Sequence, residues 1–264
     1  MIRVAINGVC GRMGGVILSL ALEDKEIKVV AALEHHGHPQ LGADIGALTG
    51  RAGLGVPLSH ALTAETDVLI DFTEPEATMT ALETCQDKNI AMVVGTTGHS
   101  TEQRAAIEDA ADKIPIVLAP NMSVGVNVLF ELVRHAAAML DDGYDVEIIE
   151  AHHRFKKDAP SGTAKGLLES IIEGREIENP QVIYGREGLT GERKRGEIGI
   201  HAVRAGDIVG DHTVLFATNG ERIELTHRAH SRQCFARGAI QAVKYIFGKP
   251  PGLYSMRDVL GIKD

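Results

Sequence analysis

The sequence is poor in the residues that mark several classes of protein. Among its 264 residues there is no tryptophan, only 4% are aromatic, and three are cysteine. Cys10, Cys85 and Cys234 are too scattered for a disulfide framework and lack metal-ligand spacing, which fits a reducing compartment. No apolar run approaches the roughly 20 residues of a membrane helix, and no signal-peptide pattern is present. We therefore expect a cytoplasmic protein without a membrane partner.

Positive charge is also scarce. The formal net charge is −9, and nucleic-acid binding needs a basic face, so we expect no nucleic-acid partner. The hydrophobic fraction of 44% and the charged fraction of 24% are ordinary for a globular protein. The length allows one large domain or two modest ones, each with its own core.

A glycine-rich turn follows the first expected strand. Residues 2–7 form a β-branched run, and apolar residues at helical spacing follow the glycines, which therefore lie between a strand and a helix. Gly11 and Gly14 fit the dinucleotide-binding pattern G-x-G-x-x-G. Val9 stands where the first glycine belongs, and Gly8 comes one place early. The alternative is an ordinary strand–turn–helix with structural glycines.

An acidic residue supports the dinucleotide interpretation. A second strand, 28–33, ends at Glu34, twenty residues after Gly14, where a carboxylate can bind the ribose hydroxyls of adenosine. The turn is expected to contact the cofactor through Gly8, Val9, Cys10, Gly11, Arg12 and Met13, and Glu34 is followed by His35 at the same site.

Three further strands of buried type alternate with helices. The strands span 66–72, 90–94 and 114–118, with helical segments near 76–88 and 100–112. Such alternation predicts a parallel, doubly wound sheet of the Rossmann type, with ligands beyond the carboxyl ends of its strands. The strand ends are small and polar and let the backbone approach a flat nicotinamide ring: Asp71-Phe72-Thr73, Gly95-Thr96-Thr97 and Ala119-Pro120-Asn121. We expect cofactor contacts there at Phe72, Gly95, Thr96, Thr97, Ala119, Pro120, Asn121 and Met122.

A histidine-rich segment lies between the second and third strands. Residues 35–60 read as a loop with a short helix, and His35, His36 and His38 could indicate a metal site. No carboxylate or cysteine completes a ligand set, so we expect solvent-exposed histidines and no metal.

The pattern changes after residue 123. A helix over 125–140 and another over 163–173 accompany a strand at 145–150 and β-rich segments from 181 to 230. These predict an α+β domain with an open antiparallel or mixed sheet. The helix at 234–247 is expected to return to the first domain. We therefore expect a dinucleotide-binding domain, 1–123 with 233–264, and a substrate-binding and oligomerisation domain, 124–232.

A basic stretch lies within the second domain. Five of the six residues from 152 to 157 can carry positive charge: His152, His153, Arg154, Lys156 and Lys157. Pro160 and Gly162 then form a tight loop, and Ser161 or Thr163 can cap the following helix. Cationic side chains beside a helix N-terminus suit a small polyanion, and histidine can transfer protons near neutral pH. The alternative is a solvated basic loop.

With these motifs the chain resembles the 4-hydroxy-tetrahydrodipicolinate reductase family over nearly its whole length. The most specific motif is the histidine-lysine-proline-serine stretch at 150–164. The others are the segments 8–14, 95–98, 121–127, 186–188, 190–193 and 203–210.

The resemblance implies a reductase of the diaminopimelate route to lysine, a homotetramer joined through the sheets of the second domain. It implies NADH and/or NADPH as hydride donor and a small cyclic dicarboxylate as substrate, reduced with loss of water. By position, His152 matches the catalytic histidine and Lys156 the proton-donor lysine. His153, Ser161, Gly162 and Thr163 match substrate-binding positions, with Gly162 and Thr163 at one carboxylate. A cationic neighbourhood would help Lys156 to lose its proton.

Two positions depart from the family pattern. His35 stands where many relatives carry an arginine that can pair with the 2′-phosphate of NADPH. Because Glu34 repels a phosphate while His35 or Arg12 can tolerate one, we expect use of both cofactors, with NADH at least as good. Phe155 stands at a position where relatives may carry a polar residue. If the strand alternation continues to this position, the Phe155 side chain faces away from the reacting groups.

Two other functions are alternatives to a reductase of this family. A homoserine or aspartate-semialdehyde-type dehydrogenase would share the first domain, but the latter type needs an active-site cysteine and none lies between Cys85 and Cys234. A non-enzymatic NAD sensor would usually add a basic DNA-binding module, for which the chain has neither length nor charge.

Overall fold

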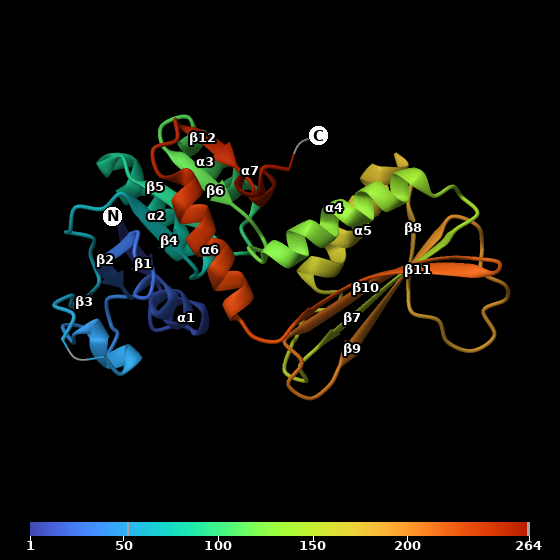
Figure 1. Cartoon of the computed structure of the whole chain (residues 1–264), viewed down its shortest axis with the longest axis horizontal. Helices are drawn as coiled ribbons and strands as arrows, with labels where there is room; N and C mark the ends of the chain where they lie inside the picture. Colours follow the sequence, from blue (N-terminus) through green and yellow to red (C-terminus); the bar gives the residue numbers. More distant parts are fainter. Residues whose placement is uncertain (52, 263–264) are drawn as a thin grey trace. The chain divides into compact units, whose positions relative to one another are not determined.

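The computed structural model describes residues 1–51 and 53–262, which divide into two compact units (Figure 1). Met1–Val124 and the C-terminal segment from Gln233 form the first unit, and Gly125–Arg232 forms the second. Within the described residues, no helix is both long and apolar enough to cross a membrane.

The first unit is built on a parallel sheet of seven strands in the order β12-β6-β5-β4-β1-β2-β3. The strands are β1 (Ile2–Asn7), β2 (Ile27–Leu33), β3 (Leu58–Ser59), β4 (Val68–Asp71), β5 (Ala91–Val94), β6 (Pro115–Leu118) and β12 (Gly252–Tyr254). The predicted doubly wound fold is confirmed.

Helices cover both faces of this sheet, which explains why its strands read as continuous apolar runs. They are α1 (Arg12–Ala21), α2 (Pro75–Lys88), α3 (Thr101–Ala111), α6 (Gln233–Ile246) and α7 (Met256–Leu260), with a short 3₁₀ helix, η1 (Ile45–Thr49). Along β1, Val4 and Ile6 belong to the core beneath α1 and α6, while Ala5 belongs to the core beneath α2 and α3. Helix α6 packs against α1 in this unit.

Three short elements were not predicted from the sequence. Strands β3 and β12 are two and three residues long, and α7 has five residues. Elements this short show no measurable periodicity in the sequence, so they are recognised only in the structure. β12 extends the sheet by parallel pairing with β6.

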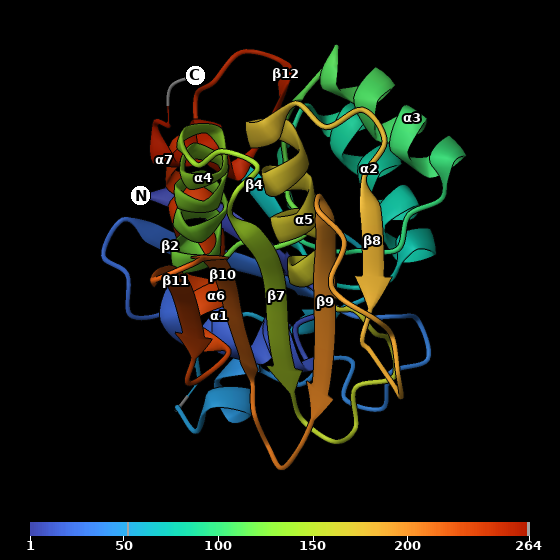
Figure 2. The ribbon, with the colours of Figure 1, turned by 90° about the vertical axis from the view of Figure 1, so that its right-hand side faces the viewer.

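The second unit contains a mixed sheet of five strands in the order β11-β10-β7-β9-β8, seen side by side in Figure 2. The strands are β7 (Asp145–His152), β8 (Gln181–Tyr184), β9 (Glu197–Arg204), β10 (Gly210–Thr218) and β11 (Glu221–Ala229). β10 pairs antiparallel with β11 and β7, while β7, β9 and β8 run parallel. Helices α4 (Val124–Met139) and α5 (Gly162–Arg175) contribute to its single core.

Strand β7 brings polar groups into that unit's interior. Its alternate residues from Val146 onward are buried, and the last two of them are Glu150 and His152. The strand continues to His152, two residues past the expected end. A carboxylate and an imidazole therefore share the buried face at the carboxyl end of β7.

Candidate active site

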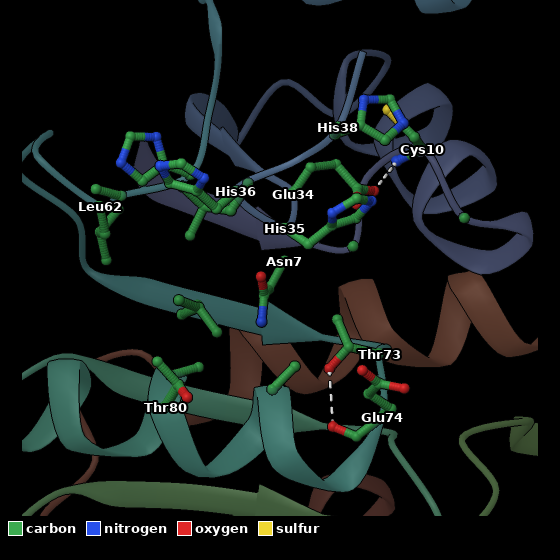
Figure 3. Close-up of a pocket in the computed structure, with 18 of the residues that line it drawn as sticks. Asn7, Cys10, Glu34, His35, His36, His38, Leu62, Thr73, Glu74 and Thr80 are labelled. Carbon is green, nitrogen blue, oxygen red and sulfur yellow. Dashed lines mark hydrogen bonds between the residues drawn. The ribbon is translucent and has the colours of Figure 1, made fainter. Parts of the chain in front are cut away.

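A pocket of about 870 Å³ lies in the first unit, at the carboxyl ends of β1, β2 and β4 (Figure 3). Of the predicted cofactor residues, it is lined by Gly8, Cys10, Gly11, Glu34, His35 and Phe72. The wall also contains residues that the sequence analysis did not assign, among them Asn7, His36, His38, His60, Thr73 and Glu74.

Glycine is needed at two positions of the turn for different physical reasons. Gly8 has a φ of +76°, and a Cβ there would lie 2.7 Å from the Thr73 side chain. A Cβ on Gly14 would lie 2.7 Å from Val9 Cα and closer still to the Gly8 carbonyl oxygen. Helix α1 can therefore approach the turn this closely only because position 14 has no side chain.

Glu34 is held in place by the turn that it faces. Its Oε1 accepts the backbone N–H of Cys10 at 2.8 Å, the dashed contact in Figure 3. Burial and the nearby Glu34 carboxylate raise the pKa of the Cys10 thiol, which keeps it neutral. The acidic residue and the glycine turn thus form one preorganised edge of the pocket.

Four histidines line the pocket together with Glu34. The rings of His35 and His38 meet edge-on at 5.5 Å, and those of His36 and His60 at 4.8 Å. Within 1–51 and 53–262, no group of three or more His, Cys, Asp or Glu residues is arranged to hold a metal ion. His35 and His36 are exposed, as expected, and His38 is half-buried.

A buried carboxylate joins the strand ends beneath the pocket. Asp71 is fully buried and accepts hydrogen bonds from Asn7 Nδ2 at 2.7 Å and from the hydroxyls of Thr73, Thr78 and Thr96 at 2.8, 2.5 and 2.7 Å. The Thr96 hydroxyl also accepts the Thr73 N–H at 2.9 Å. The sequence analysis recognised Asp71 only as a strand end, because its partners lie on other elements.

The remaining predicted cofactor residues do not line this pocket. Val9 and Met122 are buried in the core, and Ala119 N donates to Val94 O at 3.1 Å. Gly95 contacts the Phe72 ring, which occupies the position where a side chain at residue 95 would lie. Thr96 belongs to the Asp71 network, Asn121 Oδ1 accepts the Ser123 N–H at 2.8 Å, and Arg12, Thr97 and Pro120 are exposed; Met13, in the first turn of α1, is half-buried.

Glu150 is the centre of a second polar cluster, in the second unit. Its Oε2 lies 2.6 Å from His152 Nδ1, and Arg204 donates to both carboxylate oxygens at 2.8 Å. The Ser161 N–H donates to Oε1 at 3.0 Å. Burial alone would raise the pKa of Glu150, but hydrogen bonds from His152, Arg204 and the Ser161 N–H lower it to about 2. Glu150 is therefore a carboxylate throughout the working pH range.

His212 is a neutral neighbour of this cluster. Its Nε2 lies 3.1 Å from Ser161 Oγ, and its ring meets that of His152 edge-on at 5.1 Å. Burial, with a smaller contribution from His152, lowers the pKa of His212 to about 3. Pairing of β10 with β7 sets His212 opposite Glu150. Sequence reasoning missed both His212 and Arg204, since only strand register brings them here.

Acid is expected to destabilise the protein through His212. Its pKa is about 3 when folded and 6.5 in a free chain, so between these values only the unfolded chain binds the proton. Lowering the pH from 6.5 to 4.5 should cost about 2–3 kcal/mol of unfolding free energy through this group. Denaturant unfolding of wild type and His212→Gln at both pH values measures it. The variant should lose less stability, and an equal loss would contradict the assignment.

Ser161 begins the helix that follows the basic stretch. Its hydroxyl accepts the Ala164 N–H at 3.2 Å, so Ser161, and not Thr163, is the N-cap of α5. Gly162 is exposed and Thr163 half-buried in the first turn of the helix. The first turn of a helix presents N–H groups and a positive dipole end that favour an anion.

The loop between β7 and α5 differs from expectation at two residues. The strand ends at His152, so its alternation does not orient Phe155, which lies in a turn with 78% of its surface exposed. Lys156 Nζ forms an ion pair with Asp158 Oδ1 at 3.0 Å. The sequence predicted a cationic neighbourhood for Lys156, whereas its ionic partner in the structure is this carboxylate. His153 Nδ1 is buried without a hydrogen-bond partner in the part of the chain described.

These features define a class of protein. A parallel sheet with a glycine turn after its first strand and a carboxylate after its second is a Rossmann-type nucleotide-binding unit. Gly14 lets helix α1 pack closely against the turn, and the turn and Glu34 both line the pocket, which is the arrangement that binds a dinucleotide in this kind of fold. The second unit adds a buried imidazole paired with a carboxylate, which is suited to proton transfer. The class is that of nucleotide-dependent oxidoreductases built from two units.

Comparison with known proteins narrows this class to a family. The family models "Dihydrodipicolinate reductase, N-terminus" and "Dihydrodipicolinate reductase, C-terminus" match residues 2–122 and 125–260. The chain is 52% identical over 267 residues to the 4-hydroxy-tetrahydrodipicolinate reductase of Thiobacillus denitrificans, covering 99% of each. It is 50% identical over 268 residues to that of Syntrophotalea carbinolica, covering 100% of each.

Solved structures agree. The dipicolinate-bound dihydrodipicolinate reductase from Paenisporosarcina sp. TG-14 matches with a TM-score of 0.78 at 30% identity, covering 100% of both chains. An aspartate semialdehyde dehydrogenase from Vibrio cholerae, related to one of the rival functions, shares the fold alone, with a TM-score of 0.54 at 11% identity. The chain belongs to the dihydrodipicolinate reductase family, as the resemblance indicated. It is an oxidoreductase whose Rossmann-type unit implies a pyridine nucleotide cofactor.

Proposed function

We propose that the protein reduces 4-hydroxy-tetrahydrodipicolinate to tetrahydrodipicolinate with loss of water, in the diaminopimelate route of lysine biosynthesis. Full-length similarity to relatives of that name supports the proposal. The structural observation that carries it is the buried Glu150–His152 pair beside the N-terminus of α5. When bound, the reduced nicotinamide supplies the hydride that goes to ring carbon C4.

The second unit would bind the substrate and move the proton. Gly162 and Thr163 offer backbone N–H groups and a hydroxyl to one carboxylate at the N-terminus of α5, which Ser161 caps. His153, directly after β7, would contact the substrate. His152 and Lys156 would deliver the proton that the neighbouring carbon receives. The dipicolinate of the solved relative, a dicarboxylate, suits this arrangement.

The first unit would bind the dinucleotide along the pocket of Figure 3. Glu34, held by the Cys10 N–H, would bind the adenosine ribose, and the turn would hold the pyrophosphate. The strand ends would border the nicotinamide, with the backbone as the contacting surface. The residues proposed are Gly8, Val9, Cys10, Gly11, Arg12, Met13, Glu34, His35, Phe72, Gly95, Thr96, Thr97, Ala119, Pro120, Asn121 and Met122.

A coupled assay tests the function. The substrate forms when a synthase condenses pyruvate with aspartate semialdehyde, and reduction is followed as loss of NADH absorbance after addition of the protein. Oxidation that requires both carbon substrates is the expected result. If NADH is not consumed, although the synthase is shown to be active, the proposed reaction is wrong.

Both cofactors are expected to serve, with NADH at least as good as NADPH. The Glu34 carboxylate lies where a 2′-phosphate would approach and repels it, while four histidines around the pocket can soften that repulsion. Steady-state kinetics with each cofactor measure kcat/KM. In Glu34→Gln the ratio of NADPH to NADH efficiency should rise, by roughly tenfold for each 1.4 kcal/mol of repulsion removed. Strict NADPH dependence of the wild type would contradict the expectation.

A cytoplasmic homotetramer joined through the sheet of the second unit completes the proposal. The sheet face opposite the helices carries exposed apolar side chains, Ile149 and Val203 among them. Such side chains favour burial against another copy. Analytical ultracentrifugation measures the assembly, and a monomer at micromolar concentration would refute it.

A further inference from the structure

We propose that Glu150 is a positioning residue for this reaction: it holds His152 as the tautomer protonated at Nδ1, which leaves Nε2 as the atom that gives and takes the proton. The inference rests on the proposed function for its role in turnover, but the tautomer itself can be observed independently. His152 is the group that would touch substrate, and Glu150 acts through it.

The hydrogen bonds around Glu150 leave one solution for the imidazole. A carboxylate only accepts, and Arg204 and the Ser161 N–H occupy both oxygens with donated hydrogen bonds. His152 Nδ1, at 2.6 Å from Oε2, must therefore be a donor as well. The neutral ring then carries its hydrogen on Nδ1, and Nε2 is left as the basic nitrogen.

The supports of Glu150 come from separate elements, which makes the geometry rigid. Glu150 and His152 share one face of β7, and the parallel register sets Arg204 of β9 beside His152. Ser161 contributes its N–H from the start of α5. Glu150 is fully buried, so water does not compete for its oxygens.

Charged and titratable groups from several elements lie around the Glu150–His152 pair. Glu150 on the same strand, Arg204 on β9 and His212 on β10 lie around the ring. In the following loop, Lys156 pairs with Asp158 and contributes to the lowered pKa of His212. Burial keeps His212 neutral, so it adds no charge. Glu150 is thus the anion in direct contact with the imidazole.

The chain contains a matched pair for comparison. On the same strand, Glu147 accepts from His201 Nε2 at 2.7 Å and from Arg186 and Arg193. Hydrogen bonds from Arg186, His201 and Arg193, against the opposing effect of burial, lower the pKa of Glu147 to about 2 as well. It lies on the other face of the sheet from Glu150 and therefore does not contact His152.

The test uses the full-length protein with Glu150→Gln, Glu150→Asp and Glu147→Gln. In Glu150→Gln, kcat should fall roughly 10- to 100-fold, and the alkaline limb of its pH profile should move toward acid, while KM for NADH stays within twofold. Glu150→Asp should restore the position of the limb, because it keeps the charge. Glu147→Gln should leave the limb in place. A fall in kcat with an unmoved limb, or equal shifts in both glutamine variants, would overturn the proposal.

Nitrogen-15 NMR of the wild-type imidazoles provides a readout that depends on neither folding of the variants nor turnover. At a pH where the ring is neutral, His152 should show a protonated Nδ1 and an unprotonated Nε2. The opposite tautomer would overturn the proposal even if the reductase assay succeeds. The expected tautomer in a protein that fails the reductase assay would support Glu150 positioning and reject only the proposed reaction.

Discussion

Replacing His152 by alanine is expected to lower turnover by ~100- to 10,000-fold, the range that positioned acid–base groups contribute. The side chain lies at the carboxyl end of β7 in contact with the Glu150 carboxylate, so its loss removes the proposed proton-transfer group. Binding of NADH should remain within about twofold of wild type, since the dinucleotide pocket lies in the other unit. Steady-state kinetics give kcat, and fluorescence titration gives the Kd for NADH.

Two further variants make this result interpretable. His135→Ala removes an exposed histidine of α4 in the same unit and should leave kcat unchanged. Lys156→Ala should lower kcat with NADH binding intact, and it frees Asp158 from its ion pair. Loss of NADH binding in His152→Ala would show that the cofactor and proton-transfer functions are not divided between the units as proposed.

Replacing Gly14 by alanine is expected to destabilise the first unit and to weaken NADH binding at least tenfold. A Cβ there meets only backbone, 2.7 Å from Val9 Cα and closer to the Gly8 carbonyl, and backbone cannot rotate away. Overpacking of this kind costs about 1–3 kcal/mol or more. To relieve it, α1 must move away from the turn that is to approach the pyrophosphate. Thermal unfolding and isothermal titration with NADH measure both effects.

The neighbouring glycine of the same helix is the control. A Cβ on Gly15 would meet only Val9 O at 3.8 Å, an ordinary van der Waals contact. Gly15→Ala should therefore raise stability by up to about 1 kcal/mol through helix propensity and keep NADH binding. Equal behaviour of the two variants would mean that the close approach at position 14 does not matter for the turn.

Features that are local in sequence could be predicted. Gly8, Gly14 and Glu34 follow one another along a strand–turn–helix–strand segment, so their spacing alone indicates where they meet. Ser161 precedes its helix by one residue, and it was one of the two residues expected to cap that helix for the same reason. The seven-stranded sheet was predictable in outline because strands buried on both faces read as uninterrupted apolar runs.

Contacts set by strand register could not be predicted from one sequence. Arg204 reaches Glu150 across 54 residues, and Asn7 reaches Asp71 across 64. A shift of one residue in pairing would turn such side chains to the opposite face, so residue types alone do not identify the partners. Phe155 shows the same limit locally, since strand periodicity does not tell where the strand ends.

Ser161 serves two elements with two different atoms. Its hydroxyl accepts from Ala164 in the first turn of α5, while its backbone N–H donates to Glu150 on β7. Ser161 therefore connects two parts of the proposed site. One is the N-terminus of α5, which is proposed to bind a substrate carboxylate, and the other is the Glu150 side chain, which is proposed to orient His152. A displacement of α5 along its axis must stretch or tilt the hydrogen bond to Glu150. An inhibitor that pulls on this helix end would strain the orientation of the imidazole without touching the ring.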